Sequence, residues 1–599
     1  MPHAAISLAF IFMLIVSWRR WTSPIIDSGR ELDLPLRLLR GELLYRDVHY
    51  LYPPLSPYLN ALLYRLFGAH LDVLLASGVV CAVVVIALCY LIARRLMRPW
   101  EAAVAAIMVI VWCVFKPAGN LISPYAFAAL HGMMLALGGL LFTLRYGERQ
   151  RRRELLAVGS LIGLAAITKQ EFAVAAAVTV TAALSFIHRT NFKLLVSRLA
   201  LVAIPAAAIA LPVYGFFLRR VGWQILVADC HLFYTHLPAS LVYYNAQRTG
   251  LDHPFSSLAQ MLGAAAVGVA IAVAIAWLSI LSATWGERSG LKARLPKMTR
   301  WCGLIFVISM ACVFSLKALT HNRWDGSPLR ALPLLLLGLI VAEWRRATIR
   351  KGVSPAPPPH LFITSVYSLA ILARVALRVP SGGAFGGFFL PTSLILIYYL
   401  VTLAWPHALG SRTQHPRIAH RARLMGQTFL GVLLFVTAVV FAVRYRANYN
   451  FEVTAPRGRL YTTRPVGQAM HEAIDFITAR TAPDEAIAVL PEGSDLAFLS
   501  GRRMPLRLQI FLPGFLDEPG ERDEIRRLQQ APVRYLLIVN RPVREFGAEA
   551  LGRDYFPTLG RWIEEHYRLA LVCGIAHDHQ LQIGDPAFFI KIYAAHDAP

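Results

Sequence analysis

Long apolar runs, separated by short polar connections, occupy the first three quarters of the chain. Most of them approach the ~20 residues that an α-helix needs to cross the hydrocarbon core of a bilayer. They lie at about 4–16, 70–93, 101–115, 126–144, 155–168, 172–187, 199–218, 258–283, 301–316, 329–343, 361–378, 388–404 and 425–443. This pattern predicts a mostly α-helical, polytopic membrane protein of about thirteen transmembrane helices.

Basic residues gather in every second connection, and the connections between them are sparser. The clusters lie at 94–98, 145–153, 189–198, 288–300, 345–351 and 412–423. Because Lys and Arg are enriched in cytoplasmic loops, the alternation predicts a cytoplasmic N-terminus. Thirteen spans then place the C-terminal region on the external side. We expect a multi-pass protein of the inner (plasma) membrane with a periplasmic C-terminal domain.

The first external connection, at about 17–70, is too polar to span a membrane and has its own helical periodicity. Leucines recur at helical spacing in two stretches, which predicts short amphipathic helices lying at the membrane interface. The leucines of the first stretch are Leu36, Leu39, Leu43 and Leu44, and those of the second are Leu59, Leu62, Leu63 and Leu66.

From residue 448 onward, short β-rich runs alternate with amphipathic helical stretches, which predicts a small α/β domain. The β-rich runs are 486–490, 535–539 and 588–593, and the helical stretches are 466–480, 521–530 and 559–567. The predicted organisation is a transmembrane domain at 1–447 and an external α/β domain at 448–599.

Composition and charge exclude several classes of protein. The chain is 56% apolar and only 16% charged, whereas soluble globular chains have roughly 25% charged residues. The net charge is +25, yet the residues from 444 to the end hold 19 basic and 20 acidic side chains. The positive excess therefore lies wholly in the membrane part, which indicates topology and not nucleic-acid binding. A soluble enzyme, a disulfide scaffold and a disordered chain are excluded.

The start of the first external connection offers a candidate catalytic carboxylate. It reads Asp27-Ser28-Gly29-Arg30-Glu31. Asp27 follows the first helix by about ten residues, so it sits just outside the bilayer. There it could take a proton from an acceptor hydroxyl while a lipid-borne donor lies in the membrane. The structural alternative is that Asp27 caps the following helix.

Several short motifs occur together in the first 190 residues. They are Gly41-Glu42-Leu43-Leu44-Tyr45-Arg46-Asp47, Pro53-Pro54, Leu66-Phe67-Gly68 and Gly163-Leu164-Ala165-Ala166-Ile167-Thr168-Lys169. Together with Asp27 they resemble the multi-spanning glycosyltransferases that use lipid phosphosugars, the GT-C class. The resemblance is to its protein-mannosyltransferase-like branch, which includes bacterial lipopolysaccharide-modifying transferases.

The resemblance implies roles for particular residues. In that class, an Asp at the start of the long first external loop is the catalytic base, which here is Asp27. The donor phosphate would be bound by Lys169 and Arg323. Substrate-binding candidates are Glu31, Asp47, His49, Tyr52, Glu171 and Trp324.

The chain departs from the family pattern at three points. Ser28 follows Asp27 where many members have Glu, and Tyr52 precedes the Pro-Pro pair where relatives place Lys or His. A second acidic residue expected after the third span is not evident at 116–120.

Two external cations could meet a lipid phosphate at headgroup depth. Lys169 ends one apolar run and is followed by Glu171 before the next, and ionisable residues between two spans are functional candidates. The alternative is that Lys169 reaches the interface along its apolar stem and pairs with Glu171. The His321–Asp325 loop offers Arg323 for bidentate phosphate binding and Trp324 for a sugar face. The alternative there is an ordinary solvated loop.

Other polar residues suggest weaker sites. Asp229, His231 and His236 could bind a metal, but without a third well-spaced ligand they are more typical of loop residues. Glu492 and Asp495 follow a predicted strand and form a plausible ligand edge. No metal site is therefore predicted, no cofactor is assigned, and the assistance of a divalent metal is left open.

The sequence favours a glycosyltransferase of hexosyl or pentosyl type. It would move a sugar from a polyprenyl-phosphate donor to a glycan, lipid or protein acceptor. The transfer would take place on the external side and invert the anomeric configuration of the sugar. Its partners would be that donor, the acceptor and membrane lipids, without nucleic acid. A P-loop and a Rossmann fingerprint are both lacking, as a lipid-phosphate donor requires neither. The alternatives are a transporter or lipid flippase with an external accessory domain, and a non-catalytic scaffold.

Overall fold

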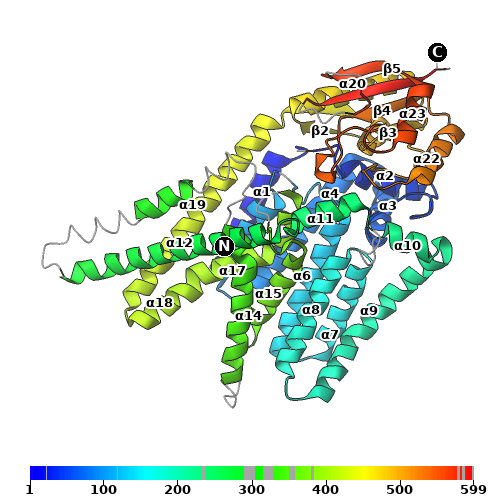
Figure 1. The fold of residues 1–599 in the computed structure, drawn as a ribbon. Helices are drawn as coiled ribbons and strands as arrows, with labels where there is room; N and C mark the ends of the chain where they lie inside the picture. Colours follow the sequence, from blue (N-terminus) through cyan, green and yellow to red (C-terminus); the bar gives the residue numbers. More distant parts are fainter. Residues whose placement is uncertain are drawn as a thin grey trace.

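The computed structural model describes residues 1–21, 23–117, 119–230, 237–288, 304–313, 328–349, 358–379, 383–576, 580–582 and 587–596. Long helices from the first 448 residues form a bundle, and the strands of a small domain lie together at one end of it (Figure 1). The predicted fold class is confirmed: a mostly helical chain with many apolar helices and a small C-terminal α/β part.

The apolar runs fold into helices close to their predicted places. Seven stretches of the described chain are long and apolar enough to cross a membrane, and the predicted total of about thirteen stays a prediction. The bundle helices are α1 (Pro2–Ser17), α4 (Leu71–Ala93), α5 (Pro99–Val109), α6 (Phe127–Arg149), α7 (Arg152–Ala166), α8 (Gln170–Ile187), α9 (Phe192–Val221), α12 (Pro254–Arg288), α14 (Leu332–Ile349), α15 (His360–Leu372), α17 (Pro391–Tyr399), α18 (Trp405–Thr413) and α19 (Pro416–Asn448).

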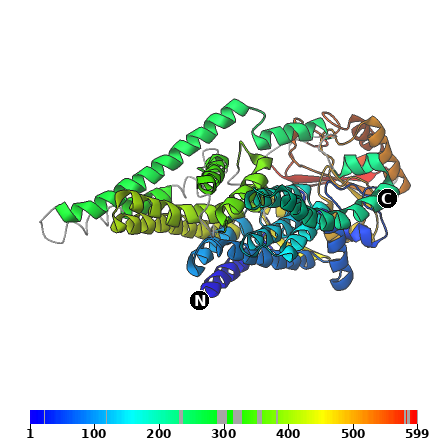
Figure 2. The same cartoon turned by 90° about the horizontal axis from the view of Figure 1, so that it is seen from below.

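Helix α6 lies at the centre of the bundle. It packs against α4, α7, α8 and α15, and its apolar window is the most buried of the seven spans. Helix α12 runs along the outer side of the bundle and packs against α19 (Figures 1 and 2). Shorter elements connect these helices: η1 (Ile110–Val114), α10 (Trp223–Asp229), α11 (Ala239–Thr249), η2 (Pro328–Ala331), η3 (Ala373–Val375), α16 (Gly383–Phe389) and η4 (Leu400–Ala404).

The two helices predicted in the first external connection are present as α2 (Ser28–Leu39) and α3 (Leu55–Phe67). Helix α3 buries Asn60 and Tyr64 and exposes Leu62 and Leu66, as an interfacial helix does. Helix α2 differs from the expectation, because residues 28–35 are all buried. It packs between α3 and a helix of the C-terminal domain, so its polar side chains have protein partners instead of water.

The C-terminal part contains a four-stranded sheet in the order β3-β4-β6-β5. Strands β3 (Ile487–Leu490) and β4 (Tyr535–Val539) are parallel, whereas β6 (Phe589–Ala595) is antiparallel to both β4 and β5 (Tyr567–Gly574). All residues of β3 and β4 are buried, as a continuous apolar run at the centre of a domain predicts. The helices are α20 (Arg464–Arg480), α21 (Ser494–Ser500), α22 (Glu518–Gln530) and α23 (Pro557–His566), with η5 (Arg544–Phe546).

A hairpin joins this domain to the end of the first helix. Strands β1 (Phe451–Ala455) and β2 (Gly458–Thr462) pair with each other. The Trp21 N–H donates to the Tyr461 carbonyl at 2.7 Å, and the Tyr461 N–H donates to the Arg19 carbonyl at 2.8 Å. The start of the segment at 17–70 is thereby fixed to the C-terminal domain.

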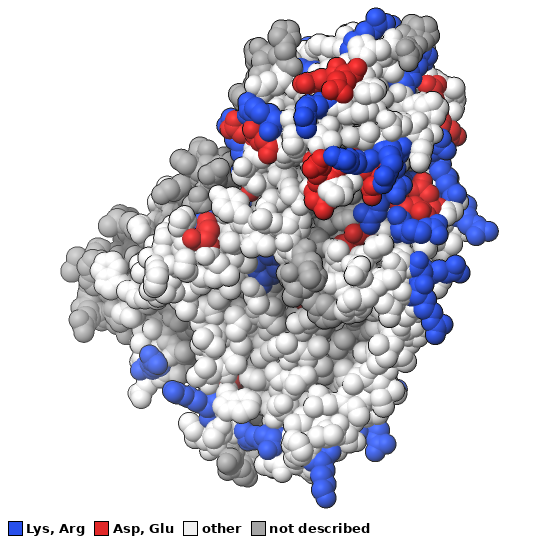
Figure 3. Space-filling view, turned by 45° about the vertical axis from the view of Figure 1, so that its right-hand side comes forward, with Lys and Arg blue, Asp and Glu red and all other residues white. Residues whose placement is uncertain are grey.

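Charged side chains divide one face of the molecule into zones. Figure 3 shows Lys and Arg at the end opposite the C-terminal domain, a broad band with few charged residues, and mixed charges over the C-terminal domain. The largely uncharged band corresponds to the apolar helices, as expected where a protein faces lipid.

Candidate active site

Asp27 occupies the turn that leads into α2, with a backbone φ of +64°. Its side chain makes no capping hydrogen bond to the helix, so the capping alternative does not describe this residue. One carboxylate oxygen, Oδ1, lies 3.5 Å from the Arg30 guanidinium, and 34% of the side chain is exposed. The carboxylate is therefore held by a cation on one side and open on the other.

Arg30 connects Asp27 to a buried cluster. Its Nε lies 3.2 Å from Glu31 Oε1, and its Nη2 donates to the Tyr125 carbonyl at 3.2 Å. Burial alone would lower the pKa of Arg30, but the Asp27 and Glu31 carboxylates raise it above its usual value. Arg30 thus remains a cation beside Asp27. The sequence reasoning gave it no role, although its position three residues after Asp27 on one helix face was an available signal.

Glu31 has protein partners on both carboxylate oxygens. Its Oε2 accepts the Phe127 N–H at 2.8 Å, at the start of α6, and its Oε1 faces Arg30. Burial raises the pKa of Glu31, although Arg30 and the Phe127 N–H oppose this effect. Glu31 therefore fixes α2 to α6, and this geometry favours a structural contribution to the site.

Lys169 lies between α7 and α8 with only 3% of its surface exposed. Its ammonium donates to the Tyr125 hydroxyl at 2.7 Å, lies 3.4 Å from Glu171 Oε1 and stands 4.2 Å from the centre of the Tyr52 ring. Burial lowers the pKa of Lys169, but Glu171 and the tyrosines raise it more, so the net shift is upward. Lys169 pairs with Glu171, as the alternative reading proposed, but it is buried instead of extending to the interface.

The cluster assembles residues from four separate segments. The structure brings Asp27, Glu31, Tyr52, Lys169 and Glu171 together through Arg30 and Tyr125. The Arg30 guanidinium lies 5.4 Å from the centre of the Tyr52 ring, and the Lys169 ammonium lies over the same ring. Tyr52, which stands where relatives have a cation, is thus in contact with two cations.

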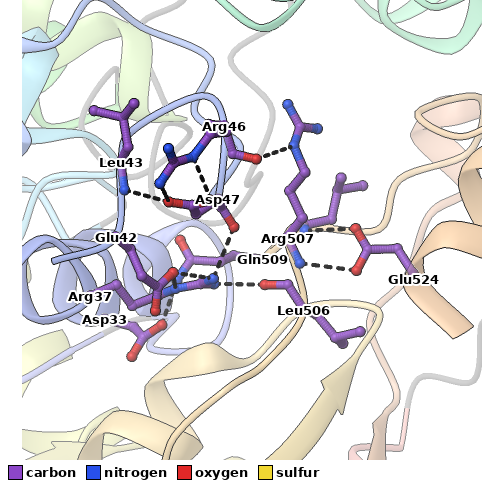
Figure 4. Close-up of polar contacts among 11 residues, drawn as sticks. Asp33, Arg37, Glu42, Leu43, Arg46, Asp47, Leu506, Arg507, Gln509 and Glu524 are labelled. Carbon is purple, nitrogen blue, oxygen red and sulfur yellow. Dashed lines mark hydrogen bonds and ion pairs between the residues drawn. The ribbon is translucent and has the colours of Figure 1, made fainter. Parts of the chain in front are cut away.

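Asp47 and His49 lie elsewhere, at the joint between the segment at 17–70 and the C-terminal domain. Asp47 accepts hydrogen bonds from Arg46 at 2.7 Å and from the Leu43 N–H at 2.8 Å (Figure 4). The His49 N–H donates to the Arg507 carbonyl at 2.9 Å, and its Nε2 is 3.9 Å from Asp229 Oδ1. These contacts all lie within this joint, and none of them involves a residue of the Lys169 cluster.

Four other candidates lie on parts of the chain that the structure does not describe. Arg323 and Trp324 fall outside the described residues, as do His231 and His236. Asp229 is described, and it is paired with Arg507.

The joint itself is a buried polar network (Figure 4). Gln509 donates to Asp33 at 2.6 Å, and Arg37 donates to the Leu506 carbonyl at 2.7 Å. The segment that contains Leu506 and Gln509 is also held from its other side, where Glu524 accepts the Arg507 N–H at 2.9 Å. Because buried polar groups are costly unless they are paired, this network fixes the C-terminal domain on α2.

The Asp33 carboxyl should make stability depend on pH. Burial raises its pKa to about 6, although Arg37 opposes the shift. Between about pH 4 and pH 6 the folded protein then binds more protons than the unfolded chain, so the free energy of unfolding falls as pH rises. Asp33→Asn removes this titration and still accepts the Gln509 hydrogen bond. We expect a higher melting temperature than wild type at pH 8 and a smaller difference at pH 5, measured on protein in detergent.

The exposed Asp484 pairs with Arg40, the residue that follows α2, and gives a control for this experiment. Asp484→Asn should leave the pH dependence of wild type unchanged. A lower melting temperature for Asp33→Asn at pH 8 would mean that the ionised carboxylate is stabilised by Arg37 and would contradict the expectation.

The C-terminal domain also reaches Asp27 directly. The Asp27 N–H donates to Glu492 Oε1, and Glu492 Oε2 accepts from Arg541 Nε at 2.9 Å. Asp495, three residues later, is fully buried, and burial raises its pKa to about 8. The turn that the sequence suggested as a ligand edge thus lies against the candidate base.

The donor set does not suit a metal ion. Within the described part of the chain, no group of three or more His, Cys, Asp and Glu side chains could hold one. Glu31 and Glu492, the carboxylates next to Asp27, each pair with an arginine. We therefore derive no step through a metal.

A family model places part of this chain among known sequences. Residues 52–214 match the model described as dolichyl-phosphate-mannose-protein mannosyltransferase. The resemblance predicted from the motifs is confirmed. The matched segment contains Tyr52, Tyr125, Lys169 and Glu171, whereas Asp27 precedes it. A comparison with curated proteins gives no significant match.

Solved structures similar to this chain include two proteins. ArnT from Cupriavidus metallidurans bound to undecaprenyl phosphate is 13% identical, with a TM-score of 0.45 over 98% of this chain and 97% of that chain. The Archaeoglobus fulgidus oligosaccharyltransferase with Zn and sulfate is 12% identical, with a TM-score of 0.45 over 89% of this chain and 67% of that chain. A second structure of the archaeal oligosaccharyltransferase AglB from Archaeoglobus fulgidus, in complex with an inhibitory peptide and a dolichol-phosphate, is also similar. It is 12% identical, with a TM-score of 0.35 over 90% of this chain and 69% of that chain.

Proposed function

We propose that this protein is an inverting glycosyltransferase that moves a hexosyl or pentosyl group from a polyprenyl-phosphate donor to an acceptor glycan, lipid or protein. The observation that carries the proposal is the half-open Asp27 carboxylate beside a buried cluster of two cations. The match of residues 52–214 to a family of lipid-phosphate sugar transferases supports it.

Asp27 acts as the general base in this proposal. Its carboxylate takes the proton of the acceptor hydroxyl, and the acceptor oxygen forms a bond to the anomeric carbon of the donor. The bond from that carbon to the phosphate oxygen breaks with inversion, and the lipid phosphate leaves with the electron pair. Because Asp27 is 34% exposed, an acceptor can approach it within hydrogen-bonding distance.

Lys169 balances the charge of the departing lipid phosphate. It is a buried cation next to a membrane span, where its electrostatic interaction with an anion is stronger than in water. Arg323 and Trp324 remain proposed contacts for the donor phosphate and sugar. Asp47 and His49 would affect acceptor binding only through the position of the C-terminal domain.

The reaction would take place on the external side of the inner membrane. Lys and Arg gather at the end of the molecule opposite the C-terminal domain (Figure 3), and Asp27 contacts that domain through Glu492. This arrangement supports a cytoplasmic position for the basic end and for the N-terminus. Residues 1–447 would then form the membrane domain and residues 448–599 a periplasmic domain.

Native mass spectrometry of the gently extracted Asp27→Asn protein tests the proposal. We expect a polyprenyl-phosphate sugar to co-purify, and its mass would give the class of sugar. Addition of a detergent extract of the cell envelope should discharge this donor from wild type but not from the variant. Repeated absence of such a species, together with failure to bind added undecaprenyl phosphate, would overturn the proposal and favour the transporter alternative.

A further inference from the structure

A turn of the C-terminal domain lies directly on the backbone of Asp27. The turn joins β3 to α21 and contains Glu492, which is 3% exposed. Glu492 Oε1 accepts the Asp27 N–H across a sequence separation of 465 residues. A hydrogen bond from a backbone N–H to a carboxylate is stronger than one between neutral groups. The contact therefore constrains the position of Asp27.

Arg541 holds Glu492 in this position. Its Nε donates to Glu492 Oε2 at 2.9 Å, and its Nη2 lies 3.2 Å from Glu545 Oε1. Each oxygen of Glu492 thus has its own partner, one from the C-terminal domain and one from the candidate site. The side chain has little freedom to rotate away, because both it and Arg541 are buried.

The same turn is in close contact with the first turn of α2. A Cβ added at Gly29 would lie 2.3 Å from the Asp495 backbone nitrogen and 2.7 Å from Ser494 Oγ. Real Cβ atoms do not approach backbone atoms so closely, so a side chain at position 29 would displace the turn. Gly29 therefore permits the approach that lets Glu492 reach Asp27.

Asp27 itself has an unusual backbone conformation. Its φ of +64° is sparsely populated by residues other than glycine, and such conformations persist where the surroundings determine them. The Asp27 carboxylate is connected to its backbone by few rotatable bonds. A shift of the backbone would consequently move the carboxylate away from the acceptor.

We propose that Glu492 is a positioning residue for the transfer reaction and that the C-terminal domain completes the site by fixing the Asp27 backbone. The inference rests on the proposed function, in which Asp27 is the base. It assigns the domain a part in catalysis itself, in addition to any part in acceptor binding.

The test compares the rate at which donor-loaded protein loses its donor mass when envelope extract is added. Glu492→Ala should slow this discharge on the order of 10²-fold, because a misplacement of about 1 Å is enough for such a loss. The dissociation constant for undecaprenyl phosphate should remain that of wild type, since Lys169 is not in contact with Glu492. Glu492→Gln has one acceptor oxygen for two donors, the Asp27 N–H and Arg541 Nε, so it should recover only part of the rate.

Glu521 provides a matched control, because it is a buried carboxylate that accepts the Leu559 N–H at 2.8 Å within the same domain. Glu521→Ala should lower the melting temperature without changing the discharge rate of folded protein. Equal rates for Glu492→Ala and Glu521→Ala would overturn the proposal.

Gly29→Ala tests the same contact without removing a charge, and it answers the question if Glu492→Ala fails to fold. It should slow discharge at least 10-fold at an unchanged dissociation constant, whereas Gly263→Ala, which has open space around it, should not. A wild-type rate in Gly29→Ala would contradict the inference. If Asp27→Asn discharges its donor like wild type, the proposed function fails instead.

Discussion

Asp27→Asn should slow sugar transfer by about 10²- to 10⁴-fold, the range expected for loss of a general base. The amide keeps the size of the side chain and its contact with Arg30, but it cannot take the acceptor proton. The Asp27 N–H to Glu492 hydrogen bond is a backbone contact and survives the change. The rate of donor discharge into envelope extract measures the effect, and the affinity for undecaprenyl phosphate should not change.

Asp72→Asn is the matched control for this variant. Asp72 is also an aspartate paired with an arginine, Arg19, and its side chain is 31% exposed, close to the value for Asp27. It lies at the start of α4 and away from the cluster described above, so its loss should leave discharge at the wild-type rate. Similar rates for Asp27→Asn and wild type would remove Asp27 from the reaction.

The helical framework could be predicted from the sequence because each apolar run carries its own signal. The runs at 70–93 and 126–144 became α4 and α6 with small changes at their ends. Short elements with mixed polarity were not predicted. Helix α21 spans only Ser494–Ser500 and was not predicted, although Asp495 within it was named as a candidate. Strand β5 begins at Tyr567, where a helix was expected to end. Helix α21 has only seven residues, about two turns, and burial along β5 does not alternate from one residue to the next, so neither element has a clear periodic pattern.

The candidate site was predictable only in its local parts. The motifs around Asp27, Tyr52 and Lys169 identified segments, but pairwise contacts between segments leave no trace in a single sequence. The Tyr125 carbonyl is 95 residues from Arg30 along the chain, and Glu492 is 465 residues from Asp27. Asp47 and His49 illustrate the converse, because their place in a family-like motif suggested substrate contact while their side chains lie at the joint with the C-terminal domain.

Lys169→Ala should weaken the binding of undecaprenyl phosphate by about 10- to 100-fold, as expected for loss of a charged hydrogen-bonding partner worth roughly 1.5–3 kcal/mol. The lysine is one of two cations in the buried cluster, and Arg30 is already paired with Asp27 and Glu31. Its removal also leaves Glu171 without its ammonium partner, which adds repulsion toward a phosphate. Native mass spectrometry at increasing lipid concentration measures the dissociation constant.

Lys193→Ala is the control for Lys169→Ala, because it removes the same single positive charge at an exposed site near the start of α9. This variant should bind the lipid as wild type does. Lys169→Arg distinguishes charge from shape. A guanidinium restores the charge, but it is larger than an ammonium in a site where the Tyr52 ring centre is 4.2 Å away and the Tyr125 hydroxyl accepts at 2.7 Å. We therefore expect partial recovery of affinity. Unchanged affinity in Lys169→Ala would mean that the lipid phosphate binds elsewhere, and Arg323 would become the first residue to replace.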